Sequence, residues 1–125
     1  IVGTELGETL NGSQQTDFIN GLGGSDRIFG GNEDDVIYGG AGDDTITGNN
    51  DDDLLFGESG TDSIFGGAGD DVIYGGADSD TITGNNGSDI LYGGAGNDNL
   101  DGGNGADILF AGLGLDTLIG GAGND

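Results

Sequence analysis

The sequence has no cysteine, proline, histidine, methionine or tryptophan, and its one basic side chain is that of Arg27. Without cysteine, the chain has no disulfide and no thiolate metal ligand. Without histidine, it lacks the commonest general base and transition-metal ligand. The 32 glycines do not indicate collagen, because a collagen triple helix also needs abundant proline.

Charge of one sign dominates the chain, whose 24 acidic residues give a net charge of −23 at pH 7. We expect no nucleic acid partner, because phosphate binding needs clustered lysine and arginine. The longest apolar run, residues 108–111, is far shorter than the roughly 18 residues that span a bilayer. The chain starts without a methionine or a leader and stops inside a repeat, so we expect residues 1–125 to be one block of a larger protein.

A nine-residue period organises the sequence. Abundant glycine and high net charge are typical of disordered chains, but a regular period contradicts that interpretation. When repeats are counted from Gly3, position one is glycine in every repeat except the one that starts at Ala111. Position six is acidic in every repeat, and position eight is isoleucine or leucine in every complete repeat. A flexible linker has no physical reason to keep this phase without an insertion or deletion.

Each repeat combines a turn with a strand. Positions one to six are glycine-rich and favour turns, whereas positions seven to nine have β-branched and aromatic content around an apolar centre and predict a three-residue strand. So short a strand is stable only when many strands stack. We therefore expect two repeats to form one 18-residue turn of an all-β coil of about six and a half turns. Position eight would point inward, and positions seven and nine outward.

The repeats at 66–74 (GGAGDDVIY) and 93–101 (GGAGNDNLD) resemble the RTX (repeats-in-toxin) nonapeptide, and the resemblance extends over residues 3–125. It implies a right-handed parallel β-roll with two repeats per turn. It also implies a secreted or cell-surface bacterial protein, exported by type I secretion. Repeats one and two, residues 3–20, are degenerate.

The acidic positions predict a cation. Stacking one turn on the next places position-six carboxylates about 5 Å apart along each edge of the coil, where they repel unless a cation lies between them. Carboxylate and loop carbonyl oxygens suit Ca²⁺ better than Mg²⁺, which demands a tighter octahedral geometry.

The resemblance implies an ion between each loop and the loop 18 residues later, or about ten ions in all. The implied carboxylate ligands on one edge are Asp26, Asp44, Asp62, Asp80, Asp98 and Asp116. Those on the other edge are Asp35, Asp53, Asp71, Asp89, Asp107 and Asp125. The loop carbonyls that we expect to contribute include those of Gly21, Gly30, Gly39, Gly48, Gly57, Gly66, Gly75, Gly84, Gly93 and Gly102.

Some repeats depart from this pattern. Repeats one and two keep the acidic residue, as Glu8 and Asp17, but lack most of the loop glycines, so we expect no tight site at either. Acidic residues replace glycine at position four in three repeats, where a positive φ would strain them: Glu33, Asp51 and Asp78. Acidic residues at position five are expected to be solvated surface groups: Asp34, Asp43, Asp52 and Asp70.

We expect no catalytic activity from this segment. Paired carboxylates can serve a glycosidase, but here every pair recurs in register, whereas an active site breaks the symmetry once. The serines have no histidine or lysine to activate them.

The two outer faces differ in polarity. One sheet would present mostly threonine, serine and asparagine. The other would present an apolar face made of Val36, Tyr38, Leu54, Phe56, Val72, Tyr74, Ile90, Tyr92, Ile108 and Phe110. An exposed apolar ribbon of this size is typical of an interface, so we expect it to pack on a flanking domain or on another roll.

Three roles of the parent protein stay open. A structural protein of a surface layer, filament or adhesin fits the long regular array and the apolar face. A toxin or hydrolase would carry its active domain outside this block, with the repeats towards its C-terminus. A polysaccharide-binding module is less favoured, because Arg27 alone would meet an anionic polymer.

Overall fold

The computed structural model describes residues 1–125, and no helix that could span a membrane is present. Thirteen strands follow one another along the chain. They are β1 (Thr9–Asn11), β2 (Phe18–Asn20), β3 (Arg27–Gly31), β4 (Val36–Ala41), β5 (Thr45–Asn50), β6 (Leu54–Ser59), β7 (Ser63–Ala68), β8 (Val72–Ala77), β9 (Thr81–Asn86), β10 (Ile90–Ala95), β11 (Asn99–Gly105), β12 (Ile108–Leu113) and β13 (Thr117–Gly123).

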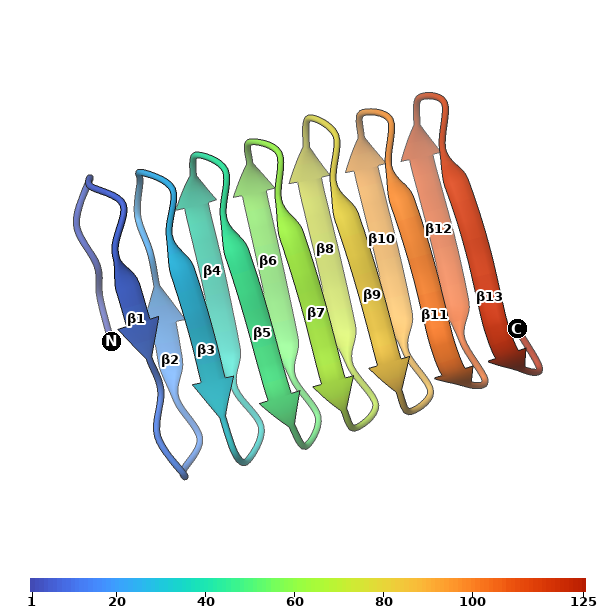
Figure 1. Cartoon of the computed structure of the whole chain (residues 1–125), viewed down its shortest axis with the longest axis horizontal. Coiled ribbons are helices and arrows are strands. Elements are labelled where there is room, and N and C mark those ends of the chain that lie inside the picture. The colour runs from blue at the N-terminus through green and yellow to red at the C-terminus, as the bar shows by residue number, and fades with distance from the viewer.

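The strands form two parallel sheets that face each other. Odd-numbered strands make a seven-stranded sheet in the order β1-β3-β5-β7-β9-β11-β13, and even-numbered strands make a six-stranded sheet from β2 to β12. Each strand pairs with the strand one turn later in an 18-residue register, as Ile37 does with Leu55. Figure 1 shows the chain passing back and forth between the sheets as it advances along one axis. The prediction of an all-β solenoid with two repeats per turn is confirmed.

Position eight supplies the core, as predicted. Ten of these side chains are fully buried between the sheets and form one continuous cluster: Ile19, Ile28, Ile37, Ile46, Leu55, Ile64, Ile73, Ile82, Leu91 and Leu100. Leu10 and Leu109 pack against this cluster near its two ends and are only partly buried. The core is therefore one side chain wide, and its continuity depends on the stacking of turns.

Most strands are longer than the three residues expected. From β4 onward each has six or seven residues, because positions one to three of the next repeat continue the strand. Pairing between turns explains the extension, since Gly40 and Ala41 at the end of β4 pair with Glu58 and Ser59 at the end of β6. Only β1 and β2, in the degenerate repeats, keep three residues.

Candidate metal centre

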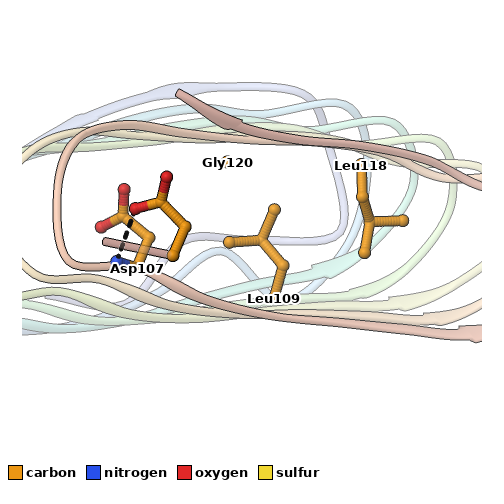
Figure 2. A pocket seen from close by; sticks show the side chains of 5 residues that line it. Asp107, Leu109, Leu118 and Gly120 are labelled. Carbon is orange, nitrogen blue, oxygen red and sulfur yellow. Dashed lines mark hydrogen bonds between the residues drawn. The ribbon is translucent and has the colours of Figure 1, made fainter. Parts of the chain in front are cut away.

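Two rows of aspartates lie inside the roll. No more than 3 % of each of these residues is exposed, and none of their carboxylates forms a salt bridge with a basic group. They are Asp26, Asp35, Asp44, Asp53, Asp62, Asp71, Asp80, Asp89, Asp98 and Asp107. Position six is two residues before the core position, so its side chain points to the same side of the chain. Figure 2 shows Asp107 and Leu109 projecting into the space between the sheets at the C-terminal end.

The aspartates of each edge are linked from turn to turn. The amide N–H of Asp26 donates to Oδ1 of Asp44 at 2.7 Å, and that of Asp44 donates to Oδ1 of Asp62 at 2.8 Å. On the other edge, Asp35 N–H donates to Oδ1 of Asp53 at 2.8 Å. The pattern continues along both edges and ends at Asp116 and Asp125. The structure thus brings together the carboxylates that the sequence paired at 18-residue spacing.

The second oxygen of each buried carboxylate has no partner. Oδ2 is buried and makes no hydrogen bond in all ten of the aspartates from Asp26 to Asp107. A buried polar group left unsatisfied costs about 1–3 kcal/mol, and a charged group costs more. Ten such oxygens in a protein of 125 residues therefore indicate that a ligand binds beside them.

Position-one glycines make room for these oxygens. A Cβ on Gly39 would lie 2.5 Å from Oδ2 of Asp44 and 2.9 Å from the carbonyl oxygen of Gly57. The carboxylate and a backbone carbonyl from the next turn therefore converge on the space that a side chain would fill. This close approach explains glycine at position one and places one of the expected carbonyl groups beside the carboxylate.

Burial makes these carboxylates hard to ionise. The pKa is raised to about 7 in Asp53, Asp71 and Asp80, and to about 6 in Asp44, Asp62 and Asp89. Removal from water is the largest cause, the amide hydrogen bond from the preceding turn opposes it, and neighbouring carboxylates raise the pKa further. The pKa values of Asp26 and Asp35 are also raised, chiefly by burial. A bound cation would remove this penalty.

The donor set fits a hard divalent cation. All the candidate side-chain ligands are oxygens, and no group of three or more acidic side chains converges at one point, so backbone carbonyls or water would complete a coordination shell. Calcium accepts six to eight such oxygens in flexible geometry.

Comparison with known families agrees with this chemistry. The family model for the RTX calcium-binding nonapeptide repeat, which spans four copies, matches residues 2–37, 29–64, 47–82, 56–91, 65–100, 83–118 and 92–125. The chain belongs to the RTX calcium-binding repeat family. It is accordingly a calcium-binding repeat module with a β-solenoid fold. A search of curated proteins gave no match.

The RTX loops contain a second ladder that sequence reasoning missed. Position-five side chains are exposed, as expected, yet they accept hydrogen bonds from the next turn. Asp52 N–H donates to Oδ1 of Asp34 at 3.2 Å, and Asp70 N–H donates to Oδ1 of Asp52 at 2.8 Å. On the other edge, Thr61 N–H donates to Oδ1 of Asp43 at 2.9 Å. Position five therefore binds the following turn, whereas position six binds the preceding one.

Two positions of each RTX loop have a left-handed backbone. Positions two and four have positive φ in every repeat from the third to the thirteenth, as at Gly40 (114°) and Gly42 (125°). The strain expected at position four is present, since φ is 64° at Glu33, 69° at Asp51 and 75° at Asp78. Position two carries further non-glycine examples at Leu22, Asn49, Glu58 and Asn85.

The apolar residues of the six-stranded sheet lie on its outer face, as predicted. Their aromatic rings stack along the roll with centroids 4.6–5.0 Å apart and planes within 7° of parallel from Tyr38 to Phe110. Phe18 continues the row with a tilted ring. Stacking leaves the central residues of this face only partly exposed, whereas Ile108 and Phe110 at its end are more open, with about half of each exposed.

Proposed function

We propose that this chain is a structural module that completes its fold by taking up calcium between successive turns. The observation that carries the proposal is the set of ten buried Oδ2 atoms without a hydrogen-bond partner. Each belongs to a loop that faces another carboxylate-bearing loop 18 residues away, and each lies near a backbone carbonyl.

The carboxylates of Asp26, Asp44, Asp62, Asp80, Asp98 and Asp116 would hold the ions of one edge, and those of Asp35, Asp53, Asp71, Asp89, Asp107 and Asp125 those of the other. Position-one carbonyls, such as that of Gly57, would add to them. Five gaps per edge give about ten ions, whose charge of about +20 would nearly cancel the −23 of the chain. When bound, calcium supplies the positive charge that the sequence lacks and accepts the free carboxylate lone pairs.

Calcium binding and folding would be one process. Without the ion, a core one side chain wide has to offset the repulsion between 24 acidic groups, and such a chain is expected to be largely unfolded. Extracellular calcium modules bind at about 10⁻⁴ to 10⁻³ M, far above cytosolic calcium. The chain would therefore stay unfolded inside the cell and fold after export.

The role that fits best is structural, in a secreted or cell-surface protein. From the third repeat onward no carboxylate loop stands out as a single special site, and one outer face is apolar from β4 to β12. We propose that this apolar face, from Val36 and Tyr38 to Ile108 and Phe110, packs on another roll or on a flanking domain.

Far-ultraviolet circular dichroism during a calcium titration tests the proposal. We expect a cooperative coil-to-β transition near millimolar Ca²⁺ and no transition with Mg²⁺ at the same concentration. A chain that is fully folded in chelator, that responds equally to both ions or that stays disordered in Ca²⁺ would overturn the proposal.

A further inference from the structure

The first two loops differ in backbone from all the loops with buried carboxylates. No residue before Leu22 has positive φ, whereas positions two and four are both left-handed in every repeat from the third to the thirteenth. The change coincides with the sequence, because position two is Thr4 and Ser13 in the first two repeats and position four is Leu6 and Gln15. These four residues keep the negative φ that is usual for L-residues.

In this different loop, position two bonds to the carboxylate of its own repeat. Thr4 donates twice to Glu8, from N–H to Oε2 at 2.8 Å and from Oγ1 to Oε1 at 3.0 Å. Ser13 donates twice to Oδ2 of Asp17, from N–H at 2.6 Å and from Oγ at 2.8 Å. The oxygen that has no partner in ten later repeats is therefore satisfied in the second repeat, and both carboxylate oxygens are satisfied in the first.

The first turn nevertheless joins the same ladder as the others. Glu8 N–H donates to Oδ1 of Asp26 at 2.8 Å, and Asp17 N–H donates to Oδ1 of Asp35 at 2.7 Å. Its carboxylates are half-buried rather than fully buried, so they need less compensation for lost water. The turn thus offers the next one the usual contacts without presenting an unsatisfied charge of its own.

We propose that residues 3–20 form a calcium-independent cap, in which the hydroxyl and amide donors of Thr4 and Ser13 take the place that the cation has in later loops. The inference rests on the proposed calcium sites and specifies where they begin. The ion series starts at Asp26 on one edge and at Asp35 on the other, and the residue at position two decides whether a loop uses a cation or its own donors.

Counting bound calcium in full-length variants tests the cap. Asp17→Asn and Asp53→Asn are a matched pair, since both residues occupy position six of the same edge. We expect Asp17→Asn to leave the number of ions unchanged and Asp53→Asn to lower it. Ser13→Ala should lower the thermal unfolding midpoint at saturating calcium, again with no ion lost, because only a hydroxyl donor has been removed.

A gain-of-site variant makes the test sharper. S13G/Q15G gives repeat two the glycines of a later loop and frees Oδ2 of Asp17, so we expect about one additional ion. Loss of an ion in Asp17→Asn, or no added ion in S13G/Q15G while Asp53→Asn behaves as expected, would overturn the cap alone. A wild-type chain that binds no calcium would overturn the proposed calcium sites instead.

Discussion

The amide N–H of Asp53 donates to Oδ1 of Asp71 at 2.9 Å, one full turn later, while Oδ2 of Asp71 is buried and has no partner. One carboxylate thus has two tasks. Oδ1 fixes the distance between successive turns, and Oδ2 is left for a ligand. Because the same division recurs along both edges, removal of one carboxylate is expected to disturb both stacking and metal binding.

Asp71→Asn is the most direct test of this division. The amide oxygen of asparagine can still accept the hydrogen bond from Asp53, but the negative charge is lost. We expect the calcium concentration at the folding midpoint to rise by about threefold to tenfold. Asp101→Asn is the control, since Asp101 is an outward residue of β11 with no hydrogen bond to its carboxylate. Equal midpoints for the two variants would contradict the assignment.

The raised pKa values predict how the metal-free chain responds to pH. In the roll, the pKa of Asp53, Asp71 and Asp80 is about 7, against an ordinary value of 3.8. The folded state therefore holds more protons than the unfolded state between about pH 4 and pH 7, and its free energy of unfolding falls as pH rises through that window. This contribution is fully present below about pH 4.

Circular dichroism of the metal-free chain from about pH 4 to pH 8 checks this prediction. We expect β structure to be greatest at the acid end and to disappear towards neutrality. At about pH 6, calcium addition should release protons, because bound carboxylates are ionised. β structure that instead increases with pH in the absence of metal would contradict the buried position of these side chains.

Gly39→Ala tests the close approach at position one. The added Cβ would lie 2.5 Å from Oδ2 of Asp44 and 2.9 Å from the carbonyl oxygen of Gly57. Asp44 is buried, so there is little room for these atoms to move away. We expect a loss of about 1–3 kcal/mol in the free energy of unfolding at saturating calcium, measured by chemical denaturation.

Gly23→Ala is the matched control for Gly39→Ala. Gly23 is equally buried, but at position three the nearest backbone atom to an added Cβ is 3.6 Å away, and only the flexible end of Glu5 lies closer. Ala41 and Ala77 already occupy the equivalent position. A similar loss in both variants would show that the carboxylate contact is not the cause.

The sequence predicted the core and the ladders of this fold because each depends on a single strict position. Isoleucine or leucine at position eight and aspartate at position six recur every nine residues, so the period itself places Ile46 inside and Asp44 beside it. Asp44 and Asp62 are neighbours in successive turns because turns of 18 residues stack on one another.

Properties that depend on contacts between turns could not be predicted from one repeat. Gly39, Gly40 and Ala41 have little intrinsic preference for a strand, yet they extend β4 because the neighbouring turns supply their hydrogen bonds. The role of Asp52 at position five depends equally on the N–H of Asp70, which is one turn away. The donors at Thr4 and Ser13 could not be predicted from the repeat pattern either, because their hydrogen bonds to Glu8 and Asp17 depend on a loop backbone that differs from that of the later repeats.

The aromatic row on the outer face gives the last prediction. Tyr74 and Tyr92 stack at 4.6 Å and Tyr38 and Phe56 at 4.6 Å, so every central ring already contacts its neighbours along the roll. The faces of the rings are used within the molecule, and their edges remain for a partner. Replacing Tyr38, Tyr74 and Tyr92 by serine should abolish self-association while the number of bound calcium ions stays the same.

The same triple variant should lose some stability, because each stacked pair contributes about 0.5–1.5 kcal/mol. Sedimentation must therefore be compared at calcium concentrations that keep both proteins folded. Thr45→Ser with Thr81→Ser on the opposite sheet is the control and should leave sedimentation unaltered. Unchanged self-association in the tyrosine variant, or a wild-type roll that stays monomeric at every concentration, would show that the row does not mediate self-association.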